Sequence, residues 1–575
     1  MPLARYLLIR AARAATYHLH RRQLRFLRAC ENPEDVQLAL LHRILRRQAV
    51  TAFGRDHHFA TIRTLADYRH QVQVAPYERL EPYIERVKKG DTNALIAGDR
   101  MVMFALTSGT TAARKLIPIT HRYLADYRRG WNLWGIRAYR DHRPRDLAFR
   151  PIVQMVGDPE EYRTEAGIPC GNLSGFTALV QKRMIRWMYA VPAISGKITD
   201  SRSRYYLALR LSIGRPCSLF TSANPSTLIM LGRTLDAEKE SLLRDLHDGT
   251  LSSNLDLPDV VRTSVVPRLK ANPARSRALA AIAKQTGHLY PKDVWPPETI
   301  LIGTWTGGSM APYLRQLPQY YGTPPIRDLG LLASEGRMTI PFANDTPAGV
   351  LDIWSHYFEF IPEAEFESTN PTVLGAHELT DGQAYYIVPT TASGLYRYQI
   401  SDLVRVRGFI GRTPMVEFLG KGHRFANLTG EKLSEHHVTQ AMNITLRTTG
   451  FAVSTYSLSP VWHDLQPYYG LFVEESEAHD AIAVKRFLHA YDEALGELNI
   501  EYAAKRSSGR LGAVRACVIP NGTWATWDRY RIAKTGGSPE QYKHPCLIGD
   551  TSFATTMPIQ REIDHESDES DESDE

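Results

Sequence analysis

A stretch of small and hydroxylated residues follows an apolar run and has residue types that suit chemistry on phosphate. Residues 101–106 are typical of a buried strand, and after them come Thr107, Ser108, Gly109, Thr110, Thr111 and Lys115. Hydroxyl and backbone N–H groups bind phosphate oxygens, glycine permits close approach of the backbone, and lysine adds a positive charge. The Walker pattern G-x-x-x-x-G-K-[ST] is not present here. A phosphate-binding loop and a plain serine- and threonine-rich turn therefore both stay open.

Two later apolar runs enclose a helical segment and end in residues that allow a ligand to approach. Residues 299–302 and 326–332 are predicted strands, and residues 313–321 between them are predicted to be helical. Strand–helix–strand order predicts a parallel pair, whose ligands bind at the carboxyl ends of the strands. The first strand leads to Gly307 and Gly308, which let the backbone lie close to a ligand.

Carboxylates stand near the ends of other predicted strands. Ser334 and Glu335 follow the run 326–332, and Asp402 ends the stretch 394–402, Gly-Leu-Tyr-Arg-Tyr-Gln-Ile-Ser-Asp. Carboxylate oxygens are ligands for Mg²⁺ and acceptors for hydroxyl groups. Glu335 as a helix-capping acid and Asp402 as a turn residue at a strand end are the alternative interpretations.

The elements that must position these residues are readable from spacing and from Pro and Gly. Asn32 is predicted to cap a helix, because Pro and two acids follow it. Residues 121–139 have a helical pattern with Trp131 and Trp134 on one aromatic side, which indicates core packing or the wall of an acyl pocket. Residues 167–175 are predicted to be a loop, because Pro and three Gly interrupt regular structure.

Composition indicates a soluble globular chain in a reducing compartment. The 575 residues are 43% hydrophobic, and the five cysteines are scattered without a C-x-x-C pair, which predicts free thiols and a cytoplasmic location. We expect no stable membrane insertion and no signal peptide, since arginines interrupt the N-terminal apolar residues. A basic N-terminal helix lying on an anionic membrane is the alternative to a helix packed on the protein body.

Three stretches together resemble the nucleotide-binding motifs of the adenylate-forming superfamily, namely residues 107–115, 331–335 and 394–402. The similarity is closer to one branch, the Gretchen Hagen family of auxin-responsive acyl-acid amido synthetases, whose second motif resembles Tyr-x-Ser-Ser-Glu and whose third resembles Gly-Leu-Tyr-Arg-Tyr-x-x-Gly-Asp. Here they stand at residues 331–335 and 394–402. Residues 499–502 and 536–545 are similar to the family's Asn-x-x-Tyr and Gly-x-Ser-x-x-Gln-Tyr-Lys-x-Pro. The resemblance extends over residues 30–555.

This resemblance implies an α/β fold with two domains. The large N-terminal adenylate-forming domain, with parallel or mixed sheets, helices and a small β-barrel-like part, is expected over residues 1–421. A smaller α+β C-terminal domain that moves between half-reactions is expected over residues 422–560. Residues 561–575 are expected to be a disordered acidic tail, because the last ten residues carry seven acids and no base.

The resemblance also implies ATP-dependent activation of a carboxylic acid as acyl-AMP, followed by transfer of the acyl group to an amine, which in this family is typically an amino acid. ATP and Mg²⁺ are the implied cofactors, and no nucleic acid or obligate protein partner is expected. Lys543, Lys432 and Glu335 are the expected catalytic residues, and Glu335 is also the expected Mg²⁺ ligand. The expected ATP-binding residues are Thr107, Ser108, Gly109, Thr110, Thr111, Lys115, Gly308, Ser334 and Asp402, and the acyl-binding candidates are Trp131, Trp134 and Ser174.

The chain departs from the family pattern at three positions. Ala112 and Ser401 stand where glycine is usual, and Leu331 replaces a tyrosine that stacks on adenine. No departure removes a charged group, so we expect activity. Two alternatives stay open: an acyl-adenylating ligase that passes the acyl group to coenzyme A or a carrier thiol, and an inactive homologue that binds nucleotide or acyl group. The simpler interpretation of three lysines is that each is a solvated surface residue: Lys115, Lys432 and Lys543.

Overall fold

The computed structural model describes residues 3–107, 115–142, 150–181, 183–307, 310–366, 368, 370–421, 425–535 and 544–564. Contacts between Cα atoms divide the chain into a large unit, which contains residues 1–107 and 115–420, and a second unit that begins at Lys421. Each unit has its own hydrophobic core.

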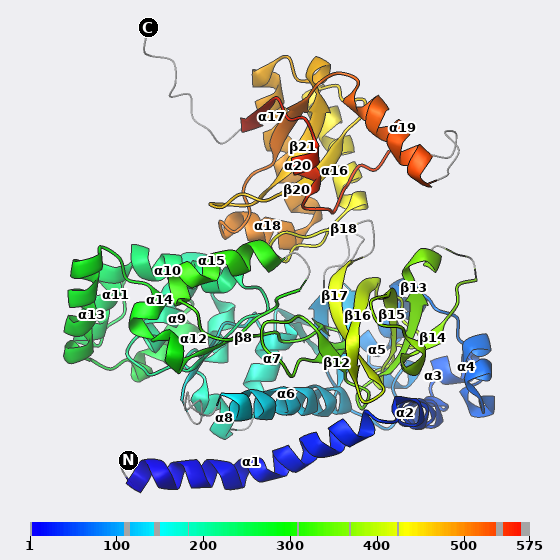
Figure 1. Cartoon of the computed structure of the whole chain (residues 1–575), viewed down its shortest axis with the longest axis horizontal. Helices are drawn as coiled ribbons and strands as arrows, with labels where there is room; N and C mark the ends of the chain where they lie inside the picture. The colour runs from blue at the N-terminus through cyan, green and yellow to red at the C-terminus, as the bar shows by residue number, and fades with distance from the viewer. Residues whose placement is uncertain are drawn as a thin grey trace. The chain divides into compact units, whose positions relative to one another are not determined.

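A parallel sheet surrounded by helices forms one part of the large unit (Figure 1). Its order is β3-β6-β7-β8, with bounds Ile152–Gln154, Leu219–Thr221, Leu301–Gly303 and Ile326–Arg327. The predicted parallel pair is confirmed, because Ile302 of β7 lies opposite Ile326 of β8 and α15 (Ala311–Tyr321) connects the two strands. The second strand is shorter than predicted, since β8 ends at Arg327.

Helices accompany this sheet, as Figure 1 shows around β8. They are α9 (Ser201–Ser212), α10 (Ser226–Ala237), α11 (Lys239–Asp248), α12 (Asp259–Val265), α13 (Pro273–Thr286) and α14 (Pro291–Val294). Their buried faces carry leucines at helical spacing, such as Leu228, Leu231 and Leu235 of α10. The apolar side chains therefore direct α10 toward the interior.

A seven-stranded antiparallel sheet forms a second part of the large unit. Its order is β11 (Thr339–Ile340), β12 (Gly349–Leu351), β17 (Thr413–Lys421), β16 (Asp402–Ile410), β15 (Ala384–Thr390), β13 (Tyr357–Pro362) and β14 (Leu374–Gly375). In β16 the alternate residues Asp402, Val404 and Val406 are buried, as expected for a strand with one face in the core.

The third sheet corrects two expectations. Its order is β2-β1-β5-β4, where β1 is Met101–Thr107, β2 is Lys115–Thr120, β5 is Pro169–Gly171 and β4 is Tyr162–Arg163. Lys115 is therefore the first residue of a strand, paired with Thr107, and not part of the preceding loop. The prediction of a loop at 167–175 is wrong, because β5 pairs in parallel with β1 and α7 (Leu173–Leu179) follows it. Pairing with β1 outweighs the local effect of Pro and Gly.

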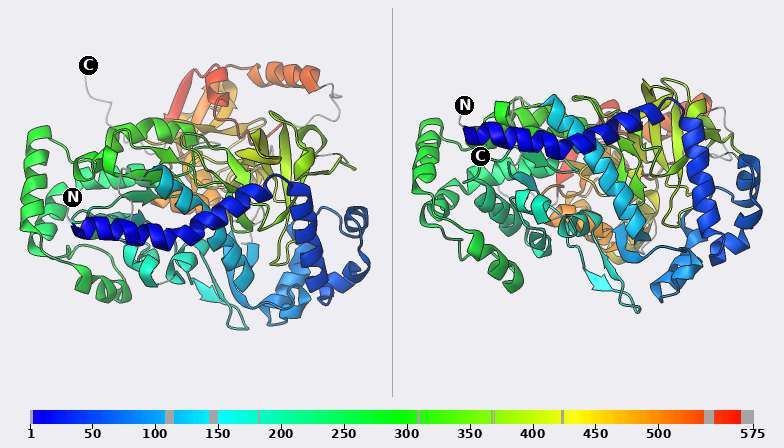
Figure 2. Two further views of the ribbon diagram at one scale, coloured as in Figure 1. Left: turned by 60° about the horizontal axis from the view of Figure 1, so that its bottom comes forward. Right: turned by 90° about the horizontal axis from the view of Figure 1, so that it is seen from below.

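Long helices cover the large unit. The first helix, α1 (Leu3–Ala29), contacts α6 (His121–Asp141) (Figure 2), and α6 confirms the helix predicted over residues 121–139. The next helix, α2 (Pro33–Gln48), begins where predicted, but the Asn32 side chain forms no capping hydrogen bond. Among the helices that the structure describes, none is long and apolar enough to cross a membrane.

The remaining helices of the large unit are short: α3 (Ala52–Asp56), α4 (Leu65–Gln71), α5 (Tyr77–Lys88) and α8 (Arg183–Met188). The second motif lies in a small hairpin formed by β9 (Leu332–Ala333) and β10 (Gly336–Arg337). All five cysteines are free, as their scattered positions predicted.

The second unit is an α+β arrangement. Its sheet has the order β20-β21-β22-β23, with bounds Ser457–Val461, Tyr468–Glu474, Arg515–Ile519 and Arg561–Asp564. The other elements are β18 (Phe425–Ala426), β19 (Leu433–Ser434), α16 (Glu435–Thr449), α17 (Ala481–Leu498), α18 (Ile500–Ser507), α19 (Thr523–Thr535) and α20 (Phe553–Thr556). The expectation of disorder from residue 561 is wrong for 561–564, because β23 pairs with β22. Residues 565–575 lie outside the described part.

Candidate functional site

Lys115 of the first motif is positioned by a tyrosine from a different element. Its Nζ lies 5.3 Å from the centroid of the Tyr77 ring, at the start of α5. The backbone N–H of Leu116 donates to the Tyr77 hydroxyl oxygen at 3.0 Å, and this hydroxyl lies 3.3 Å from the Leu116 carbonyl oxygen. Because the hydroxyl binds the backbone of β2 and the ring faces the ammonium group, Tyr77 orients the lysine.

Tyr398 brings the second and third motifs together with Tyr77. The pKa of Tyr398 is raised well above its usual value, first by burial and then by electrostatic interaction with the Glu335 carboxylate, the Tyr77 phenol and the Asp402 carboxylate. These electrostatic effects require the three groups to lie near one phenol. The structure therefore places Lys115, Glu335 and Asp402 of the three motifs in one region of the large unit.

Glu335 lies in a two-residue turn between β9 and β10, so the interpretation as a helix-capping acid is wrong. Ser334 is the other turn residue, and its carbonyl oxygen accepts a hydrogen bond from the Tyr123 hydroxyl at 2.9 Å. The next residue, Gly336, has no room for a Cβ atom, which would lie 2.3 Å from Nε2 of His356. The turn is thus held from two sides while the Glu335 side chain is 6% exposed.

Asp402 is the first residue of β16 and follows an unusual backbone turn. Ser401 has a φ of +60° and Arg397 a φ of +45°, and both lie in the left-handed region that favours glycine. The segment is paired with Ala75, two residues before α5: Ala75 N–H donates to the Arg397 carbonyl oxygen at 3.2 Å, and the Ala75 carbonyl oxygen accepts from Gln399 N–H at 2.9 Å. The turn directs the 2% exposed Asp402 into the core face of the sheet.

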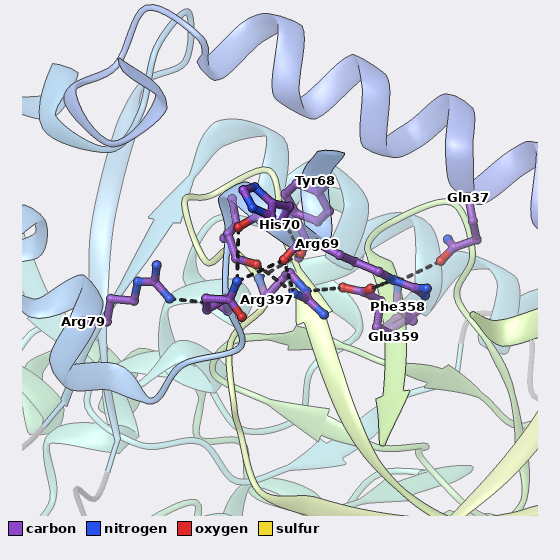
Figure 3. A network of polar contacts seen from close by, with 11 residues as sticks. Gln37, Tyr68, Arg69, His70, Arg79, Phe358, Glu359 and Arg397 are labelled. Atoms are coloured by element: carbon purple, nitrogen blue, oxygen red, sulfur yellow. Dashed lines mark hydrogen bonds and ion pairs between the residues drawn. The ribbon is translucent and has the colours of Figure 1, made fainter. Parts of the chain in front are cut away.

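A buried ion-pair network holds the third motif (Figure 3). Nε of Arg397 lies 2.7 Å from Oε2 of Glu359 in β13, and Nε of Arg69 in α4 lies 2.8 Å from Oε1 of the same carboxylate. Nη1 of Arg397 also donates to the carbonyl of Val72 at 2.7 Å. The side chains of Glu359 and Arg397 are 0% and 3% exposed. Arg397 therefore has a structural role in this motif.

Sequence reasoning missed Glu359 and Asp328. Glu359 is the one acid of β13, among apolar neighbours, and that isolation was the available signal. Asp328 follows β8, and its carboxylate accepts hydrogen bonds from Thr306 N–H at 2.6 Å, Thr306 Oγ1 at 2.8 Å and Gly330 N–H at 2.6 Å. Burial raises the pKa of Asp328 to about 6. This residue joins the segments that follow β7 and β8.

The three acyl-binding candidates make contacts within the fold. Trp134 is buried and its Nε1 donates to the Asp328 carbonyl at 2.8 Å. The Trp131 ring lies 4.6 Å from the guanidinium carbon of Arg337, and its centroid is 5.6 Å from that of Trp134. Ser174 donates from Oγ to Oδ1 of Asn172, the cap of α7, at 2.7 Å. These contacts explain each residue structurally, and the acyl role stays a prediction.

Several predicted residues lie outside the described part of the chain, namely Ser108, Gly109, Thr110, Thr111, Gly308 and Lys543. Thr107 is described as the last residue of β1. His544, the residue after Lys543, binds Oδ1 of Asp528 at 2.8 Å and Oγ of Ser457 at 2.9 Å. The chain is therefore anchored to α19 and β20 immediately after the predicted catalytic lysine.

Lys432 in the second unit is held through its backbone. Its carbonyl oxygen accepts a hydrogen bond from Nδ2 of Asn499 at 2.9 Å, and Oδ1 of Asn499 caps α18 by accepting from Tyr502 N–H at 3.0 Å. The preceding residue, Glu431, is buried and accepts from Thr429 N–H at 2.8 Å and from the Tyr469 hydroxyl at 2.6 Å. These bonds fix the main chain and leave the Lys432 ammonium group to act elsewhere.

The arrangement suits Mg²⁺ bound mainly by a substrate. Among the described residues, no group of three or more His, Cys, Asp or Glu side chains is placed to hold a metal ion. Mg²⁺ commonly uses one or two carboxylates together with substrate phosphates and water. Glu335, in its fixed turn, fits the part of the single carboxylate.

Family models match most of the chain. The GH3 family N-terminal domain matches residues 22–326, the GH3 family central domain residues 349–421 and the GH3 family C-terminal domain residues 436–552. A probable indole-3-acetic acid-amido synthetase, GH3.12 of Oryza sativa subsp. japonica, is 26% identical and covers 92% of this chain and 93% of its own. The jasmonoyl–L-amino acid synthetase JAR4 of Nicotiana attenuata is 22% identical over 85% of this chain and 86% of its own.

Solved structures share the fold. An acyl acid amido synthetase, AtGH3.15 in complex with 2,4-DB, superposes with a TM-score of 0.64 at 19% identity and covers 94% of this chain and 97% of its own. A 2-hydroxyisobutyryl-CoA ligase in complex with 2-HIB-AMP and CoA has a TM-score of 0.50 at 14% identity, with 91% of each chain covered. The predicted α/β fold with a large N-terminal and a smaller C-terminal domain is confirmed.

Replacing Glu359 by alanine should destabilise the large unit by about 3–5 kcal/mol, because Arg397 and Arg69 would be left without their buried counter-charge. Chemical unfolding followed by tryptophan fluorescence measures the change. Glu363→Ala, at an exposed residue just after β13, is the control and should change stability by less than about 0.5 kcal/mol. Equal stability of the two variants would contradict the structural role of the network.

Replacing Ser401 by glycine should stabilise the protein by about 0.5–1 kcal/mol. Glycine removes the cost of a side chain at positive φ, and part of the gain is offset by the greater freedom of glycine in the unfolded chain. The same unfolding measurement applies. Ser401→Ala keeps the Cβ atom and should show no gain, so a glycine variant less stable than the alanine variant would sink the strain argument.

Proposed function

This chain belongs to the GH3 (Gretchen Hagen) family, and from that premise we propose that it is an ATP-dependent, AMP-forming acid–amino acid ligase. It activates a carboxylic acid as acyl-AMP and transfers the acyl group to the amine of an amino acid. The observation that carries the proposal is the convergence of Lys115, Glu335 and Asp402 around Tyr77 and Tyr398, in a chain that matches all three family domains.

In the first half-reaction, a carboxylate oxygen of the acid attacks the α-phosphorus of ATP. A new P–O bond forms, the bond to the β-phosphate oxygen breaks and pyrophosphate leaves. Charge stabilisation and positioning dominate such phosphoryl chemistry. Lys115 and the backbone and hydroxyl groups of residues 107–111 are proposed to bind the phosphates, with Gly308 and Ser334 lining the nucleotide. Asp402 is proposed to accept hydrogen bonds from the ribose hydroxyls.

Mg²⁺, held by Glu335 together with phosphate oxygens, would neutralise negative charge that pyrophosphate carries. The two fixed sides of the hairpin keep Glu335 in place. Tyr123 binds the turn through the Ser334 carbonyl, and His356 fills the space beside Gly336. The chain thus supplies one carboxylate at a defined position, and the substrate completes the coordination.

In the second half-reaction, the amine nitrogen attacks the acyl carbonyl carbon. The C–N bond forms, the bond to the phosphate oxygen breaks, AMP leaves and the nitrogen loses a proton. Lys432 and Lys543 are proposed to stabilise the charge that develops at the reacting groups. A rotation of the second unit between the half-reactions would bring different groups to the substrate. The boundary at Lys421, next to Gly420, supports a hinge at this position.

The relatives' names restrict the substrate class. One is named as an indole-3-acetic acid-amido synthetase and the other as a jasmonoyl–L-amino acid synthetase, so we propose a small organic acid and an amino acid as substrates here. Five free cysteines support a cytoplasmic enzyme. No nucleic acid or obligate protein partner is needed for this chemistry.

Pyrophosphate release with ATP, Mg²⁺ and a panel of aryl, indole and fatty acids tests the proposal. Release should depend on an acid and rise when pooled amino acids are added. Asp402→Ala and Lys543→Ala should each lower the rate about 100-fold or more, since each removes a transition-state or nucleotide contact. Asp256→Ala and Lys284→Ala, at exposed residues of the large unit, are matched controls and should retain the wild-type rate.

The acceptor distinguishes this proposal from its alternatives. If AMP release requires a thiol such as coenzyme A and does not change when amino acids are added, the acceptor is a thiol and not an amine. ATP binding without pyrophosphate release from any acid would support an inactive homologue, for which Leu331 and Ser401 would be the first positions to restore.

The Glu335→Gln variant should need about tenfold more Mg²⁺, or higher, for half-maximal pyrophosphate release, because an amide oxygen carries no charge for the metal ion. A Mg²⁺ titration at saturating ATP measures this. The variant Glu363→Gln should keep the wild-type midpoint. An unchanged midpoint in Glu335→Gln would remove this residue from the Mg²⁺ site.

A further inference from the structure

A basic hollow of about 810 Å³ lies in the helical part of the large unit. It is bordered by α8, by the end of α9 and the residues after it, and by the segment around residues 268–272. None of these elements carries a residue that we assign to the ATP, acyl or amine chemistry. The cations that line it are Arg186, Arg210, Arg215, Arg268 and Lys270.

These five cations have no acidic counterpart in the lining that the structure describes. None lies within 4.0 Å of a carboxylate oxygen of a described residue. Arg210 donates from Nε to the Thr250 carbonyl at 2.9 Å and from Nη2 to the Lys270 carbonyl at 3.4 Å. Two buried arginines elsewhere in the unit do have carboxylate partners, since Arg397 pairs with Glu359 and Arg327 pairs with Asp141. The lining of the hollow therefore gathers cations that form no ion pair with a described carboxylate.

Arg210 gives this hollow a rigid base. It is 4% exposed, and burial lowers the pKa of its guanidinium while the charge of Asp245 opposes that effect. Asp245 itself accepts hydrogen bonds from the Tyr206 hydroxyl at 2.6 Å and from Ser252 N–H at 2.7 Å. A multivalent anion in the hollow could form charge-assisted hydrogen bonds to several of these cations at once.

An exposed aromatic ring borders the same hollow. The side chain of Trp187 is 71% exposed, more than that of any other aromatic residue in the described part, and Tyr189 also lines the hollow. Tryptophan presents a large flat face that stacks on planar rings and on guanidinium groups. Trp187 therefore places a surface that can bind a planar ring beside cations that can bind an anion.

We propose that this hollow is a second binding site, for a phosphorylated ligand that also carries a planar ring, such as a nucleotide. The phosphates bind the cations of the hollow, and the ring stacks on Trp187. A hollow whose base is a buried arginine suits a small ligand that enters it, whereas a flat lipid surface would contact the rim alone. The proposal concerns binding and does not rest on the ligase chemistry proposed above.

Calorimetric titration of the full chain with GTP, pyrophosphate and guanosine tests the site. GTP should bind more tightly than pyrophosphate or guanosine alone, and its affinity should fall as salt rises. The double variant Arg268→Ser/Lys270→Ser should bind GTP about tenfold more weakly, because two charge-assisted contacts are lost. Trp187→Ala should weaken GTP binding and leave pyrophosphate binding unchanged.

A charge-matched control separates the site from a general field effect and from the ATP site. Arg277→Ser/Lys284→Ser removes two exposed cations from α13, outside the hollow, and should leave GTP binding unchanged. Acid-dependent pyrophosphate release should be the same in all these variants. GTP affinity that is equal in the wild type and in both hollow variants would overturn the proposal. A loss of affinity in the control that equals the loss in Arg268→Ser/Lys270→Ser would also overturn it, because GTP would then respond to the general charge of the protein and not to this site.

Discussion

The carboxylate of Glu359 is the group on which the third motif depends. It is completely buried, and a buried carboxylate is stable only if its charge is paired and its oxygens are hydrogen-bonded. Arg69 and Arg397 provide this from two segments that are distant in sequence. The same contact ties α4, β13 and the chain that leads to Asp402 into one body. The pairing of the buried Glu359 with Arg397 therefore also fixes the position of Asp402, which lies five residues after Arg397.

Main-chain contacts position the segments that carry the remaining candidate groups. Tyr123 binds the carbonyl of Ser334, Tyr77 binds the backbone at Leu116, and Asn499 binds the carbonyl of Lys432. None of these bonds uses the carboxylate of Glu335 or the ammonium groups of the two lysines. In a site assembled in this way, rigidity comes from neighbours that are not themselves reactive.

Local patterns predicted the elements that depend on local chemistry. The helix α6 and the parallel pair β7–β8 follow from apolar spacing, and the order of the motifs identified Glu335 and Asp402. The strand β5 was missed because its partner, β1, lies more than sixty residues earlier in the chain and its own residues favour a loop. Asp328 and Glu359 were missed for a related reason. Their importance comes from what surrounds them in space, and a lone acid in an apolar run is the only trace of this in the sequence.

The departures from the family pattern affect conformation and packing more than charge. Ser401 occupies a backbone position that favours glycine, yet the following Asp402 is still directed inward from the first residue of β16. The pairing of Ala75 with Arg397 and Gln399 holds the turn. The backbone strain at Ser401 therefore lowers the stability of the protein and does not displace Asp402. Contacts with its neighbours also fix Leu331. Its N–H donates to Thr339 Oγ1 at 2.8 Å, and its side chain packs against the main core. The hairpin that presents Glu335 therefore does not need a tyrosine at this position.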